Sequence, residues 1–126
     1  MNKGKIFLAV GIGGMIGATL RYALAQAITF TSFPLATAIE NVIGCFVLAY
    51  VTFHPFIKGK LSSEVFTAIT TGVLGSFTTF STFIAESVLL LDQLEWMFLY
   101  LALQTFACIG CCFIGAKLAK RKEKAA

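Results

Sequence analysis

The chain places chemically active side chains inside long apolar stretches, where a purely structural membrane helix has no use for them. Asn41 follows Thr37 by four positions, so one helix face carries both an amide and a hydroxyl. Arg21 lies roughly fifteen residues into the first apolar stretch, where a cation either anchors a helix end or attracts an anion. Because such groups are costly at membrane depth, each predicts a functional site or a polar partner on another helix.

The segment from Gly72 to Phe83 carries the strongest local signal for a site. It reads Gly-Val-Leu-Gly-Ser-Phe-Thr-Thr-Phe-Ser-Thr-Phe, and glycines combined with so many hydroxyl residues make a poor helix. A helix break at bilayer depth frees backbone groups, which is tolerated where they are buried in protein, bind an ion or line a watery cavity. Freed carbonyls favour a cation such as Na⁺, and the N-terminal end of the following half-helix favours an anion. We therefore predict an ion site here.

Phenylalanines recur in the same segment at every third position, at Phe77, Phe80 and Phe83, which places them near one helix face. A phenyl ring has a positive edge, and edges directed into a narrow pore can contact a small anion without holding it irreversibly. Packing against lipid or other helices is the more common role of a membrane phenylalanine. The interleaved hydroxyls distinguish this stretch from a purely lipid-facing surface.

The other apolar stretches also carry polar residues. Tyr100 and Gln104 are four positions apart, so they either form the wall of a polar track or bond a neighbouring helix. Glu40 points about 100° away from its neighbour Asn41, and Glu86 lies near the end of a predicted helix. We interpret both carboxylates as hydrated at the membrane interface.

The elements that must position these residues are transmembrane helices. Of the 126 residues, 58% are apolar and 13% are charged, and the mean hydropathy of +0.87 excludes an ordinary soluble domain. We predict an all-α membrane protein with a single domain over residues 1–126, whose third helix is broken near its middle. The predicted helices cover about residues 5–30, 34–54, 62–91 and 95–117. Gly13 and Gly17 predict close approach of the first helix to a neighbour, and residues 58–60 are expected to form a polar loop.

Composition also excludes several classes of function. The chain has a single histidine, His54, and lacks a cluster of His, Cys or carboxylate groups at catalytic spacing, so we do not expect an enzyme. The cysteines lie in apolar stretches, where close packing is the expected role rather than metal binding or disulfide formation. The net charge of +4 comes mainly from the chain ends and one connection, which favours anionic lipid headgroups over nucleic acid.

Basic residues are distributed unevenly between the two sides of the predicted membrane domain. All of the ten Lys and Arg residues except Arg21 fall on the side that holds both termini and the second connection. The positive-inside rule then places both termini in the cytoplasm.

Three patterns taken together resemble the Fluc (CrcB) family of small bacterial fluoride channels. They are Gly13-Gly-x-x-Gly-Ala-x-x-Arg-Tyr22, Thr37-x-x-x-Asn-x-x-Gly44 and Gly75-Ser-Phe-Thr-Thr-Phe-Ser-Thr-Phe83. The resemblance implies a homodimer of two antiparallel, dual-topology subunits of four helices each, with two pores, in the bacterial inner membrane. Its implied partners are the fluoride ion, a second copy of the chain and the lipid bilayer. Its implied activity is passive export of F⁻, which relieves fluoride toxicity.

The same resemblance implies roles for individual residues. Asn41 becomes a hydrogen-bond donor in the pore, and Phe80 and Phe83 present ring edges to F⁻ from the broken helix. The backbone carbonyls of Gly75 and Thr78 bind a structural Na⁺ at the centre of the dimer. The remaining residues carried over to the anion path are Arg21, Thr37, Thr79, Ser81, Thr82, Tyr100 and Gln104.

Two departures from the family pattern keep alternatives open. Glu40 stands where the family usually has an apolar residue, and the uneven Lys and Arg distribution suits one subunit of a fixed-orientation heterodimer. Another alternative is a proton-coupled exporter similar to the small multidrug-resistance proteins, although the first helix lacks the acidic residue which that mechanism needs. A membrane scaffold without transport activity is the alternative from a different class.

Overall fold

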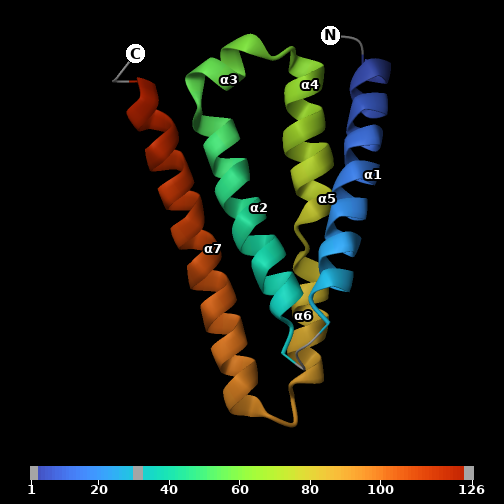
Figure 1. The fold of residues 1–126 in the computed structure, drawn as a ribbon, viewed down its shortest axis with the longest axis vertical. Coiled ribbons are helices and arrows are strands. Elements are labelled where there is room, and N and C mark those ends of the chain that lie inside the picture. Colours follow the sequence, from blue (N-terminus) through green and yellow to red (C-terminus); the bar gives the residue numbers. More distant parts are fainter. Residues whose placement is uncertain (1–2, 30–32, 124–126) are drawn as a thin grey trace.

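Four long apolar helical segments make up most of the molecule and run roughly along one common direction (Figure 1). The computed structural model describes residues 3–29 and 33–123. Three of the segments are continuous helices: α1 (Lys3–Ala27), α2 (Leu35–Phe53) and α7 (Leu94–Glu123). The fourth segment is Ser63–Leu89, and each of the four is long and apolar enough to cross a membrane. The chain is therefore an all-helical, multi-pass membrane protein.

The Ser63–Leu89 segment is assembled from short pieces rather than from one regular helix. It consists of α4 (Ser63–Thr67), the π-helix η1 (Ala68–Leu74), α5 (Gly75–Phe77) and α6 (Phe80–Leu89). Between α5 and α6 the backbone of Thr78 is extended (φ −78°, ψ 155°), and that of Thr79 is also extended (φ −147°, ψ 118°). These two residues carry the chain from one helical piece to the next without a helical turn.

Glycines allow α1 to pack directly on the backbone of the Ser63–Leu89 segment. A Cβ atom built on Gly13 would overlap with the carbonyl oxygen of Ala68, and one on Gly17 would overlap with that of Val73. The close approach predicted for the Gly13 and Gly17 pair is therefore confirmed, and its partner is η1. On the other side of the molecule α2 packs mainly on α7, and these two helices lie side by side in Figure 1.

The connection between α2 and α4 differs from the sequence prediction. We expected a polar loop at residues 58–60, but Pro55–Lys60 form the short helix α3, so that prediction is wrong. Pro55 occupies the first turn, where proline's fixed φ suits a helix start. The ammonium of Lys60 lies 4.3 Å from the ring centroid of Phe56, which adds a cation–π contact within this helix.

Helix ends differ from the prediction mainly at the termini. α1 ends at Ala27, and residue 30, where we expected its end, lies outside the described residues. α7 continues past the predicted end at residue 117 to Glu123, because the Lys- and Arg-rich sequence beyond it consists of good helix formers.

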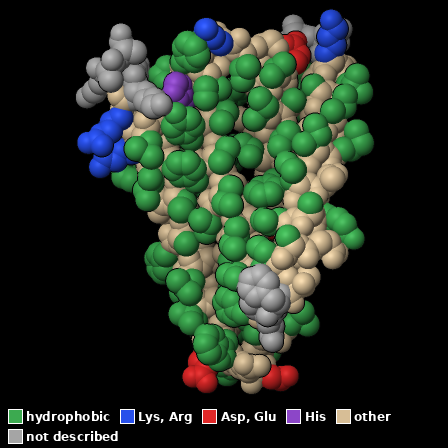
Figure 2. Space-filling view, viewed as in Figure 1, with side chains coloured by type: hydrophobic (Ala, Val, Ile, Leu, Met, Phe, Trp, Pro, Cys, Tyr) green, Lys and Arg blue, Asp and Glu red, His purple; other side chains and the backbone are tan. Residues whose placement is uncertain are grey.

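Charged side chains gather at the two ends of the molecule, with an apolar surface between them (Figure 2). Both termini and α3 lie at one end, and the turn between α6 and α7 lies at the other (Figure 1). Lysines of α1, α3 and α7 occupy the first end, whereas Asp92 and Glu95 lie in or beside the α6–α7 turn. The predicted side-to-side charge asymmetry is thus present in the folded chain.

Candidate functional site

Asn41 bridges α2 to the backbone between α5 and α6. Its Nδ2 donates to the carbonyl oxygen of Thr79 at 3.0 Å, and the Thr79 N–H donates to its Oδ1 at 2.7 Å. Both residues are buried, with 7% of Asn41 and 6% of Thr79 exposed. One amide side chain therefore satisfies both backbone groups of a residue that has left the helix, and we call this pair the Asn41–Thr79 bridge.

Gly44 brings α2 close enough for this bridge to form. It lies one helical turn beyond Asn41, and a Cβ atom built there would overlap with the methyl group of Thr78. The Thr37-x-x-x-Asn-x-x-Gly44 spacing thus places an amide donor and a gap for the extended backbone on the same side of α2.

Thr79 also caps α6. Its Oγ1 accepts a hydrogen bond from the Thr82 N–H at 3.2 Å and donates to Thr82 Oγ1 at 2.9 Å. In a continuous helix the Thr82 N–H would bond the Thr78 carbonyl, and the Thr79 N–H would bond the Gly75 carbonyl. Because both N–H groups are engaged elsewhere, the carbonyls of Gly75 and Thr78 lose their helical partners.

A cavity of about 340 Å³ lies beside the bridge, and we call it the smaller cavity. Its lining includes Asn41, Thr79, Phe80, Phe83 and Gln104. The Nε2 atom of Gln104 is buried without a hydrogen-bond partner among the described residues. The described lining of the smaller cavity therefore contains two amide side chains and no charged side chain.

Two phenylalanine rings, those of Phe80 and Phe83, line the smaller cavity and make edge contacts with neighbouring rings. Phe83 is 6% exposed, and its ring lies at 70° to that of Tyr100 with centroids 5.2 Å apart. Phe80 makes a similar contact with Phe83 at 6.0 Å, but 75% of Phe80 is exposed. The wall formed by Phe80 is therefore open in the single chain.

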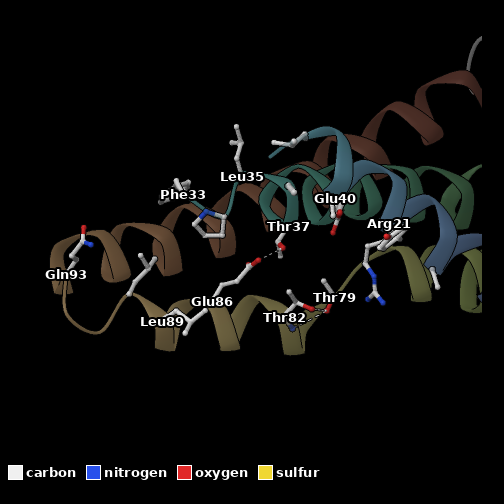
Figure 3. Close-up of a pocket in the computed structure, with 17 residues that line it drawn as sticks. Arg21, Phe33, Leu35, Thr37, Glu40, Thr79, Thr82, Glu86, Leu89 and Gln93 are labelled. Atoms are coloured by element: carbon white, nitrogen blue, oxygen red, sulfur yellow. Dashed lines mark hydrogen bonds between the residues drawn. The ribbon is translucent and has the colours of Figure 1, made fainter. Parts of the chain in front are cut away.

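A second cavity of about 680 Å³ lies toward the α6–α7 end and shares Thr79 with the first; we call it the larger cavity (Figure 3). The polar and charged side chains at its wall come from α1, α2, α6 with its cap, and the turn after α6. They are Arg21, Tyr22, Thr37, Glu40, Thr79, Thr82, Glu86 and Gln93. Together the two cavities place most of the predicted site residues around the extended backbone of Thr78 and Thr79.

The carboxylate of Glu86 is held by hydroxyls from two other helices. Thr37 Oγ1 donates to Oε1 at 2.8 Å, and Tyr100 Oη donates to Oε2 at 2.8 Å. Our interpretation of Glu86 as a hydrated interfacial residue missed these partners. A signal was available, because Glu86 lies three and four positions after Phe83 and Thr82 and so shares their helix face.

Comparison with known proteins gives the family. Residues 8–116 match the family model described as "CrcB-like protein, Camphor Resistance (CrcB)". The chain belongs to the CrcB family.

Curated relatives of this CrcB chain carry one common name. "Fluoride-specific ion channel FluC 1" of Bacillus cereus is 50% identical over 99 residues, which cover 76% of this chain and 69% of the relative. "Fluoride-specific ion channel FluC" of Oceanobacillus iheyensis is 41% identical over 115 residues, or 89% of each protein. A FluC 1 protein of Methanosarcina acetivorans is 44% identical over 92 residues, covering 71% of this chain and 70% of the relative.

Of the two predicted Na⁺ ligands, Thr78 lines the smaller cavity and Gly75 lines neither. The residues predicted for the anion path fall into three groups. Those at the smaller cavity are Asn41, Thr79, Phe80, Phe83 and Gln104, and those at the larger cavity are Arg21, Thr37, Thr79 and Thr82. Tyr100 and Ser81 line neither cavity: Tyr100 is 1% exposed and bonds Glu86, whereas Ser81 is exposed. The structure therefore brings Tyr100 to the site indirectly, through Glu86, and leaves Ser81 on the surface of the single chain.

Two kinds of residue at the cavities were not among our predicted site residues. Cys45 and Cys108 line the smaller cavity, although we had expected the cysteines to serve only in packing. Glu40 lines the larger cavity and is 2% exposed, so its interpretation as a hydrated interfacial group is wrong. The sequence could not show this because Glu40 is buried by neighbouring helices rather than by residues near it in the chain.

Proposed function

We propose that this CrcB chain is a fluoride-specific channel that exports F⁻ passively across the bacterial inner membrane and so lowers fluoride toxicity. The observation that carries the proposal is the Asn41–Thr79 bridge, which opens the helix beside a cavity lined by amides and aromatic edges. The curated relatives, each named as a fluoride-specific ion channel, support the same ion.

The chemistry of the smaller cavity suits a small anion that has shed part of its water. An amide carries two N–H donors, so Asn41 retains one after donating to Thr79, and the Nε2 of Gln104 retains both. The positive edges of Phe80 and Phe83 add weak contacts, which let the ion leave again. Conduction requires binding that is favourable enough for the ion to enter the pore and weak enough for it to leave.

Thr79 lines both cavities, so an ion that moves from the larger cavity to the smaller one would pass this residue. Arg21 at its wall raises the local concentration of anions, because a positive charge in a recess bounded by protein attracts ions of opposite sign. Thr37, Thr79 and Thr82 provide hydroxyls along this approach, and Tyr100 acts by holding Glu86. Passive movement follows the F⁻ gradient and needs no coupled reaction.

We place two antiparallel copies of the chain around the path. A second copy would cover the exposed ring of Phe80 and close the open wall of the smaller cavity. The charge asymmetry favours the alternative of a fixed-orientation heterodimer, since every Lys and Arg except Arg21 lies on one side. Labelling of a cysteine placed at residue 126 distinguishes the homodimer from the heterodimer. A membrane-impermeant reagent is applied to intact cells and to lysed cells. In intact cells about half of the chains are labelled if the orientation is dual, and all or none are labelled if it is fixed.

We further propose that the carbonyls of Gly75 and Thr78 hold a structural Na⁺ at the dimer axis. The loss of their helical partners at the break supports this proposal, because carbonyl oxygens without those partners are suitable ligands for a cation. Sodium would neutralise the carbonyl dipoles of these two residues. Replacing Na⁺ with N-methylglucamine during purification should lower the dimer's melting temperature, and an unchanged melting temperature would contradict this site.

The experiment that tests the function compares three phenylalanine variants. Phe80→Ile and Phe83→Ile should each cut F⁻ efflux from liposomes while the protein remains a dimer in crosslinking. Phe113→Ile is the matched control, because Phe113 is 74% exposed, close to the 75% of Phe80, and lines neither cavity. Efflux equal to that of the wild type from folded Phe80 and Phe83 variants would refute the proposed path.

A further inference from the structure

Glu40 is the most deeply buried charged side chain at the cavities, and neither the family pattern nor the proposed path gives it a role. Only 2% of its surface is exposed, and its Oε1 atom is buried without a hydrogen-bond partner among the described residues. It projects from α2 toward the larger cavity, whose wall it shares with Arg21 and Glu86 (Figure 3). A buried carboxylate oxygen without a partner at the wall of an anion path requires a physical explanation.

Three ionisable groups on other helices surround Glu40. Arg21 of α1 attracts it, and Glu86 of α6 repels it. Tyr100 of α7 also interacts with its charge, but the Tyr100 hydroxyl is engaged by Glu86. Both carboxylate oxygens of Glu86 accept hydroxyl bonds, so Glu40 is the carboxylate of this pair with an unused buried oxygen.

Glu40 and Asn41 act on different parts of the path. Successive residues on a helix point about 100° apart, and in this chain Asn41 lines the smaller cavity whereas Glu40 lines the larger one. An ionised Glu40 would offset the attraction that Arg21 exerts on anions in the larger cavity. A neutral side chain at residue 40 would leave that attraction in force.

We infer that Glu40 sets the rate of F⁻ conduction through its own charge: the ionised carboxylate restrains F⁻ in the larger cavity, and its protonation releases the restraint. The inference rests on the proposed fluoride path. It assigns to this chain a pH-sensitive, rate-setting residue one position before the amide that bridges the break. Glu40 thereby tunes anion access, while Asn41 and the aromatic edges provide the path itself.

Single-channel current carried by F⁻ across a planar bilayer tests the inference, because neutral HF crosses lipid without carrying current. Wild type, Glu40→Gln and Glu95→Gln are compared at pH 5.5, 7.0 and 8.5, with equal F⁻ on both sides. Glu95 is the control, since it is an exposed carboxylate in the first turn of α7 and lines neither cavity.

The expected result is a conductance that rises in the wild type as pH falls. At pH 8.5 Glu40→Gln should conduct about threefold faster than the wild type. A unit charge about 7 Å from the ion would have an effect of this size even at the dielectric constant of water. Its conductance should vary little with pH, whereas Glu95→Gln should follow the wild type.

Other outcomes overturn the inference in distinguishable ways. Equal conductance of wild type and Glu40→Gln at every pH would show that the charge of residue 40 does not control conduction. A wild-type pH profile that persists in Glu40→Gln would assign the titration to another group, with Glu86 the nearest candidate. If Glu40→Gln fails to fold, a wild-type conductance that does not change with pH overturns the inference. Absence of F⁻ current from all folded dimers would instead refute the proposed function.

Discussion

Replacing Asn41 with Ala removes the side chain that joins α2 to the extended backbone of Thr79. The substitution deletes two hydrogen bonds, of 2.7 and 3.0 Å, and leaves the N–H and C=O of a residue that is 6% exposed without their partner. Side-chain hydrogen bonds between membrane helices contribute about 0.6 kcal/mol each on average. A buried polar group left unsatisfied costs about 1–3 kcal/mol.

These values predict a loss of roughly 2–5 kcal/mol in the free energy of unfolding for Asn41→Ala, since two buried backbone groups are orphaned at once. A loss of about 4 kcal/mol lowers the ratio of folded to unfolded protein nearly a thousandfold. Asn41→Asp keeps an acceptor for the Thr79 N–H, but its carboxylate cannot donate to the Thr79 carbonyl and puts a charge at a buried position. We therefore expect Asn41→Asp to lose at least as much stability as Asn41→Ala, with a sharp fall in F⁻ flux because the amide donor is gone.

Equilibrium unfolding in detergent micelles measures the stability change, and an F⁻ electrode measures efflux from liposomes at matched amounts of folded protein. Gln26→Ala is the control, as it removes an exposed amide from α1 and should change neither quantity. The reasoning is refuted if Asn41→Ala retains both the unfolding free energy and the F⁻ flux of the wild type.

The fold and the lining of the smaller cavity give further predictions. Gly17→Ala should destabilise the protein by about 1–3 kcal/mol, because the new methyl group overlaps with the backbone of η1. Gly11→Ala should instead stabilise α1 by about 0.5–1 kcal/mol, because a methyl group there meets nothing within 4 Å. Thermal unfolding measures both changes. A bulky thiol reagent such as benzyl methanethiosulfonate should block F⁻ efflux by filling the smaller cavity at Cys45 or Cys108. Replacing both Cys45 and Cys108 with Ala should abolish the block, whereas Cys111→Ala, the control, should leave it intact. A block that survives the double substitution would contradict the cavity assignment.

Local composition was sufficient to predict the helices and one close contact between them. Apolar stretches long enough to cross a bilayer predicted four spans, because hydropathy over about 20 residues depends little on what the residues pack against. The spacing of Gly13 and Gly17 predicted a close helix contact for a similar reason, since small side chains on one face leave a surface that another backbone can reach.

The details of the site depend on contacts between residues that are far apart in the chain. The composition of residues 72–83 predicts weak helix, but Thr79 is held extended by Asn41, 38 positions away. Glu86 is fixed by Thr37, 49 positions away, and by Tyr100, 14 positions away, so its partners were invisible to reasoning about one helix at a time. Residue type and spacing singled out Asn41 and the phenylalanines, the resemblance to a known family gave them roles, and the structure added the carboxylates and thiols around them.

Selective F⁻ conduction is the central claim, and anion efflux from liposomes tests it most directly. Vesicles containing the purified wild-type protein are loaded with KF or KCl, diluted into the same K⁺ gradient and triggered with valinomycin. We predict rapid release of F⁻ without release of Cl⁻. Release of both anions at similar rates, or of neither from well-folded protein, would contradict the account.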